Sequence, residues 1–148
     1  MPFEELARHE AAHAVIARLV GVEVRVATIG PDGPRISTRY HPDEIAIDAR
    51  SALVDLAGVC MERESPPARA DIRNASRRCR KIVRARHDAD TMTAAALETE
   101  AAILFGRFGI RAAALVDDNR ALIDAVAAAL IRRGELTGDQ VDAIIRRT

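Results

Sequence analysis

Five residues near the N-terminus have the types and the spacing of a catalytic metal motif: His9-Glu10-Ala11-Ala12-His13. Residues four apart lie on the same face of a helix, so His9 and His13 can present two imidazole nitrogens to one ion. This pattern is typical of zinc peptidases, in which the Glu takes a proton from water activated by the metal. The alternative is an amphipathic helix with two polar-tipped residues near its core face.

A catalytic zinc commonly has three protein ligands, so two His leave the site one ligand short. An acidic residue can supply the third ligand, and a family resemblance singles out Asp71, with Glu62 as its rival. Asp71 can equally be the N-cap of a helix, because Asp is a favoured residue type there. Glu62 can equally be a solvated carboxylate on a helix surface. From the residues alone, both choices stay open.

Four segments of the chain resemble the FtsH-type zinc peptidases, the proteolytic domains of membrane-bound AAA+ proteases. The sequence H-E-A-A-H-A-V at 9–15 resembles the zinc motif of that family. The sequence L-V-D-L-A-G-V-C-M-E-R-E at 53–64 resembles its helix with a Gly followed by a pair of Glu. Segment 70–83 resembles the helix that opens with the third zinc ligand, and 119–145 resembles the closing helices.

The resemblance implies a zincin-like domain that binds one zinc ion per chain and hydrolyses peptide bonds. By the same resemblance, His9, His13 and Asp71 are the ligands. Glu10 is then the general base. Glu62 does not bind the ion but orients a ligand histidine through the free ring N–H of that histidine.

The sequence also departs from the family at several places. Ala12 stands where the family usually has Gly, Arg63 interrupts the pair of Glu, and the loop at 65–69 is shorter. The chain has no phosphate-binding loop of the G-x-x-x-x-G-K-[ST] kind. It also has no apolar run of the roughly 20 residues that a transmembrane helix needs. We therefore expect a freestanding peptidase domain, fed if necessary by a separate unfolding ATPase.

Hydrophobic periodicity and turn signals predict an α+β fold, mainly α, with one small antiparallel sheet. We expect one domain, 1–148, in which 1–86 forms the metal-site core and 91–148 forms a C-terminal helical part. The predicted strands are 22–29 and 35–40, paired as a hairpin. The predicted helices are 2–20, 43 or 48 to 63, 71–86, 91–108, 119–133 and a short last helix beginning with a capping box at Thr137 and Gln140.

The second predicted strand, 35–40, is the candidate substrate-binding edge. Its polar residues Ser37 and Thr38 suit burial on both faces poorly. An extended peptide can add to such an edge through main-chain hydrogen bonds. We expect Ser37 and Thr38 to contact the substrate.

Composition limits the partners that we expect. The 148 residues carry no net charge, so the chain has no overall attraction to nucleic acid or to an anionic membrane. Cys60 and Cys79 are too few for a disulfide framework and fall on apolar stripes, and the N-terminus lacks the pattern of a signal peptide. These features favour a cytoplasmic enzyme that acts on peptides or unfolded proteins.

Two rival functions remain at this stage. The first is a non-catalytic module that keeps the zincin scaffold, with or without zinc, to bind or regulate a partner protein. The second is a helical DNA-binding protein that uses the basic segment 69–86. We expect that segment to be a solvated helix face instead, and we expect Asp48 and Asp55 to face water as well.

Overall fold

The computed structural model describes residues 2–31, 33–38, 45–61, 66–87 and 91–148. Helices dominate this part of the chain, and three short strands form one antiparallel sheet, so the predicted fold class is confirmed. In chain order, the elements are α1 (Phe3–Leu19), β1 (Val24–Thr28), β2 (Arg35–Thr38), α2 (Ile45–Met61), α3 (Pro66–Arg86), α4 (Ala94–Asp118), α5 (Arg120–Arg133), β3 (Glu135–Thr137) and α6 (Gly138–Arg147).

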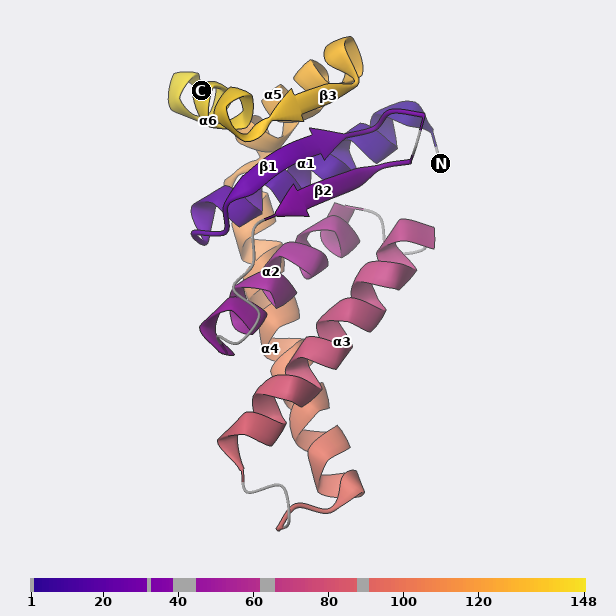
Figure 1. The fold of residues 1–148 in the computed structure, drawn as a ribbon, viewed down its shortest axis with the longest axis vertical. Coiled ribbons are helices and arrows are strands. Elements are labelled where there is room, and N and C mark those ends of the chain that lie inside the picture. The colour runs from indigo at the N-terminus through magenta and orange to yellow at the C-terminus, as the bar shows by residue number, and fades with distance from the viewer. Residues whose placement is uncertain (1, 32, 39–44, 62–65, 88–90) are drawn as a thin grey trace.

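The sheet has the strand order β2-β1-β3 and lies across α1 (Figure 1). The predicted pairing of β1 with β2 is confirmed, with Thr28 opposite Arg35. The sequence did not predict β3, because three residues are too few to show an alternating pattern. This strand follows Gly134, which ends α5 with a left-handed backbone (φ +75°).

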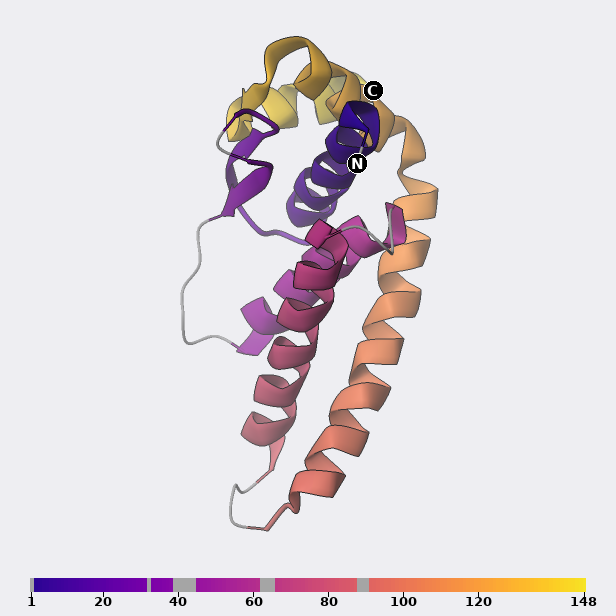
Figure 2. The same cartoon turned by 90° about the vertical axis from the view of Figure 1, so that its right-hand side faces the viewer.

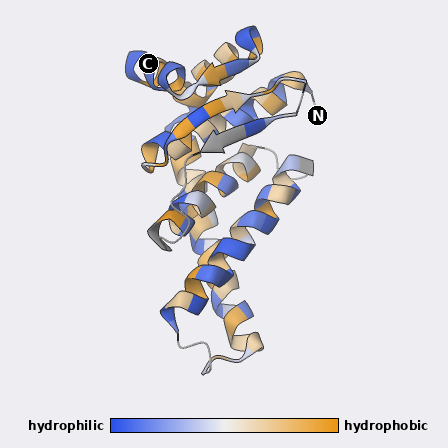
Figure 3. Cartoon of the chain, in the orientation of Figure 1, coloured by the Kyte–Doolittle hydropathy of each residue, from blue (hydrophilic) through white to orange (hydrophobic). Residues whose placement is uncertain are grey.

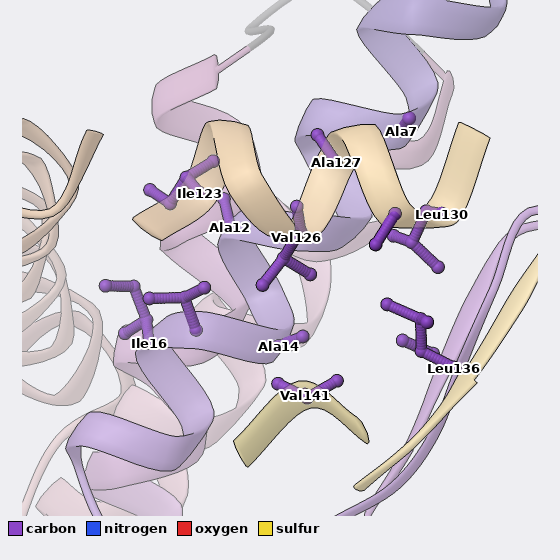
Figure 4. Packing of buried hydrophobic residues seen from close by; sticks show 14 of the residues in the cluster. Ala7, Ala12, Ala14, Ile16, Ile123, Val126, Ala127, Leu130, Leu136 and Val141 are labelled. Atoms are coloured by element: carbon purple, nitrogen blue, oxygen red, sulfur yellow. The ribbon is translucent and has the colours of Figure 1, made fainter. Parts of the chain in front are cut away.

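The main hydrophobic core lies where α1 is covered by α5 and by the sheet. Figure 4 shows Ile123 and Val126 of α5 packed over α1 near Ala12. Alanines are frequent on the buried face of α1, and their small side chains let the helices approach closely. Because Leu136 and Val141 join the same core, the C-terminal part 91–148 packs directly on the helix that carries the metal motif.

The helices α3 and α4 form a long antiparallel pair that extends away from the sheet, and α2 lies between this pair and α1 (Figures 1 and 2). One buried cluster joins the three helices through Leu53 and Leu56 of α2, Ala75 of α3 and Ala112 of α4. The visible side of α3 is largely hydrophilic (Figure 3). None of the helices in the described ranges is long and apolar enough to cross a lipid bilayer.

Two predicted helix boundaries differ from the structure by five residues or more. Helix α3 begins at Pro66 and not at residue 71, because Pro fits the first turn of a helix, where its missing N–H is not needed. Asp71 therefore lies inside α3, and its alternative role as an N-cap is wrong. Helix α4 continues to Asp118 beyond the predicted end at 108, because Ala112 and Val116 extend its buried stripe.

Candidate metal centre

The motif residues lie in the middle of α1, where that helix is covered by other elements. The exposed fraction is 0% for His9, 4% for Glu10 and 7% for His13. Polar groups buried to this degree need partners, since an unpaired buried polar group costs free energy. Burial alone therefore argues against the interpretation of these residues as ordinary members of an apolar helix face.

Three side-chain atoms converge at one point between α1 and α3. His9 Nε2 and His13 Nε2 are 3.0 Å apart, and each is 3.0 Å from Asp71 Oδ2. Donors that lie about 2.0–2.1 Å from one tetrahedral ion are about 3.3 Å from each other. The triangle of two imidazole nitrogens and one carboxylate oxygen therefore has the size and the chemistry of a zinc ligand set.

A backbone carbonyl fixes the orientation of His13. His13 Nδ1 is 2.7 Å from the oxygen of Val54 on α2, and a carbonyl oxygen can only accept, so Nδ1 carries the proton. In the neutral ring, Nε2 then turns a lone pair toward His9 and Asp71. A single cation can satisfy three converging lone pairs at once. A carbonyl that fixes the second ring nitrogen is a common feature of metal-binding histidines.

Gly58 of α2 provides the space that the two imidazole rings occupy. A Cβ atom at this position would lie 2.5 Å from His13 Cε1 and 2.8 Å from His9 Cε1, and it would also clash with His13 Nε2. The backbone of α2 therefore passes directly against the rings. Only Gly lets α2 approach the two imidazole rings of α1 this closely.

Charge interactions hold the centre together when no metal is bound. Burial would raise the pKa of Asp71, but hydrogen bonds to His13 and His9 lower it below the usual value. Burial would likewise lower the pKa of His13, but Asp71 and Glu10 outweigh this effect and raise the pKa to about 9. A proton on His13 and a negative charge on Asp71 thus stabilise the arrangement that a metal ion would also stabilise.

Glu10 lies beside the triangle and is not part of it. One ligand atom from each of His9, Glu10 and His13 lies within 4.8 Å of the others, but among the described residues it is Asp71, and not Glu10, that forms hydrogen bonds with the two rings, at 3.0 Å each. Burial raises the pKa of Glu10, and the neighbouring His13 and His9 partly offset this rise. The distances favour Asp71 as the third ligand and leave Glu10 free for a catalytic role.

The centre opens into a cleft of about 310 Å³ between α1, α2, α3 and the start of β2. Besides the motif residues and Asp71, its lining consists of Pro34, Arg35, Val54, Asp55, Pro67, Ala70, Asn74 and Arg78. Neither a protein-family model nor a curated protein sequence matches the chain. The assignment of ligands therefore rests on the motif and on the geometry given above.

The other predicted site residues are less well placed. Glu62 falls outside the described residues. Ser37 and Thr38 lie on β2, whose only partner among the described strands is β1, so the outer edge of β2 is unpaired in this part of the chain. The side chains of these two residues are not described, and the nearest lining residues are Pro34 and Arg35.

The prediction that Asp48 and Asp55 face water is wrong. The exposed fraction of Asp48 is 6%, and Asp55 is largely buried beside the metal centre. Arg78 of α3 lies between them, with Nε 3.0 Å from Asp55 and Nη1 3.4 Å from Asp48. Burial raises the pKa of Asp55 to about 6, despite the opposing effect of Arg78. Asp48 and Asp55 are seven residues apart and share one face of α2, and that face meets α3.

Proposed function

We propose that this protein is a zinc-dependent metalloendopeptidase. The single observation that carries the proposal is the triangle of His9, His13 and Asp71, with Glu10 buried beside it in a cleft. A purely structural zinc needs neither a neighbouring general base nor a cleft. We extend the proposal to membership of the FtsH-type peptidases, supported by the order of the resembling segments and by the position of Gly58 against the two imidazoles.

The ligand set that we propose is His9 Nε2, His13 Nε2 and one oxygen of Asp71, for one zinc per chain. When bound, the ion supplies Lewis acidity, which polarises the carbonyl of the scissile peptide and acidifies water. Val54 holds the ring of His13 in the orientation that this role requires. Asp71 brings a negative charge to the site through a helix that is anchored on α2 by apolar contacts.

Glu10 acts as the general base in this proposal. Its carboxylate takes a proton from the attacking water and delivers that proton to the nitrogen of the leaving amine. The substrate is a peptide or an unfolded protein segment, since only an extended chain can bring a peptide bond into a cleft of this size.

A matched pair of variants tests the proposal. The zinc-loaded protein is incubated with a fluorescently labelled unfolded protein, and cleavage is followed together with zinc content. Glu10→Gln keeps its shape and its zinc but loses activity by about 10²–10⁴-fold, because an amide cannot accept the proton. Glu5→Gln, on the same helix and outside the cleft, serves as the control and keeps full activity.

The outcome also separates the proposal from a non-catalytic module. A wild-type protein that binds zinc but cleaves no unfolded substrate contradicts the peptidase. Equal cleavage by wild type and Glu10→Gln contradicts the role of Glu10 even when zinc is present.

A further inference from the structure

The metal cleft continues into a second hollow along α3. This hollow of about 280 Å³ is lined by Asp48, Asn74, Arg77, Arg78 and Lys81, and it shares Asn74 and Arg78 with the metal cleft. The α3 residues that line the two hollows follow helical spacing: 67, 70, 71, 74, 77, 78 and 81. Such residues form one stripe along a helix, so the two hollows make one groove that leads away from the metal centre.

The acidic side chains of this groove are already engaged. Arg78 contacts both Asp55 and Asp48, and Lys81 Nζ is 3.0 Å from Asp48 Oδ2. The pairs neutralise most of the negative charge that the groove walls would otherwise present. An incoming carboxylate therefore meets little repulsion from Asp48 and Asp55.

Two arginines of the groove are exposed and have no carboxylate partner among the described residues. Arg35, at the start of β2, lines the cleft beside the metal centre and forms no salt bridge within the described ranges. Arg77 donates a hydrogen bond of 2.5 Å to Asn74 Oδ1, which is a neutral amide. The groove thus offers one cation at the metal centre and a second one farther along α3.

We propose that this groove selects substrates by their carboxylates, with Arg35 and Arg77 as the specificity-determining residues. The inference rests on the peptidase proposed above, and it names the substrate class. Arg77 is six residues from the ligand Asp71, or about 9 Å along the helix. An extended peptide covers that distance in about three residues. One carboxylate therefore lies beside the scissile bond and another about three residues from it.

An acidic peptide fits this groove better than a nucleic acid does. No aromatic side chain lines either hollow among the described residues, so nothing is present for bases to stack on. The chain as a whole carries no net charge.

Peptide binding tests the inference without requiring hydrolysis. The zinc-loaded Glu10→Gln protein is titrated into a fluorescent, C-terminally amidated peptide with two Glu three positions apart, and into its Gln counterpart. Binding is measured by anisotropy. We expect the Glu peptide to bind about tenfold more tightly, because charge-assisted hydrogen bonds are the stronger ones. Introducing Arg35→Gln or Arg77→Gln into the Glu10→Gln protein removes a large part of this difference in affinity. The control Arg25→Gln, on the exposed surface of β1 outside the groove, leaves the difference intact.

Further arms identify the source of the carboxylate. If a Gln peptide with a free C-terminus binds as tightly as the amidated Glu peptide, then Arg35 and Arg77 bind the C-terminal carboxylate of a chain. A charge reversal, Arg35→Glu with Arg77→Glu, turns the preference toward a Lys peptide. Equal binding of the Glu and Gln peptides overturns the inference. A preference for the Glu peptide that survives both arginine substitutions also overturns it. So does Arg77-dependent binding of a DNA duplex by a protein that does not bind the Glu peptide. Absence of cleavage by the wild type contradicts the proposed peptidase activity. Carboxylate-dependent binding is measured without hydrolysis, so its outcome does not depend on that activity.

Discussion

Replacing Gly58 with Ala tests whether the two imidazole rings must lie where the structure has them. The added Cβ would be 2.5 Å from His13 Cε1. Carbon atoms in contact are normally about 3.5–4.0 Å apart. The ring of His13 must therefore move by about 1 Å, or α2 must move away from α1.

This displacement is large for a metal ligand and small for the fold. Ligand distances are held to about 0.2 Å, so a shift of about 1 Å removes His13 from the ligand set. We expect zinc affinity to fall by on the order of 100-fold or more. Crowding costs about 1–3 kcal/mol of the free energy of unfolding, and Ala in place of a helical Gly returns about 0.5–1 kcal/mol. The metal-free variant therefore stays folded.

The assay is a competition titration of zinc against a coloured chelator, together with urea unfolding of the metal-free protein. Gly106→Ala on α4 is the matched control, because a Cβ at that position meets no atom within 4 Å. The control keeps its zinc affinity and gains about 0.5–1 kcal/mol of stability. Unchanged zinc affinity in a folded Gly58→Ala variant would refute the geometry of the centre.

Three further predictions concern the ligand, the pH dependence and the sheet. Asp71→Asn lowers zinc affinity by more than about 100-fold, whereas Glu62→Gln lowers it by about 10–100-fold at most. If a chelator titration gives the reverse order, the third ligand is Glu62 and not Asp71. In the metal-free protein, protonated His13 stabilises the fold below its ordinary pKa of 6.5, and this stabilisation disappears as pH rises through about 9. Urea titrations with chelator present should show that loss, and His13→Ala should reduce it. Gly138→Ala brings a Cβ against the Val24 carbonyl, so we expect the free energy of unfolding to fall by about 1–3 kcal/mol. The zinc bound per folded chain should not change. An unaltered unfolding midpoint would count against this packing.

The parts of the structure that sequence reasoning found depend on local physics. The spacing of His9 and His13, the end of α5 at Arg133, and the capping box of Thr137 and Gln140 involve neighbours within a few turns. Such features can be recognised from residue types and spacing because the partners lie on the same element or directly after it.

The parts that were missed depend on contacts between elements far apart in the sequence. The carbonyl of Val54 and the space at Gly58 matter only because α2 passes against α1 at these residues. Spacing alone does not reveal the burial of Asp55, because its partner Arg78 is on another helix 23 residues away. Asp71 became a candidate through the family resemblance and not through spacing, since 58 residues separate it from His13.

Anomalous diffraction from crystals of the zinc-loaded protein, recorded on both sides of the zinc absorption edge, tests the central claim most directly. We predict one zinc peak per chain, about 2.0–2.1 Å from His9 Nε2, His13 Nε2 and an oxygen of Asp71, with Glu10 beside the ion and not bound to it. The absence of a peak at this triangle, or a peak that Glu10 coordinates in place of Asp71, would contradict the proposed metal centre.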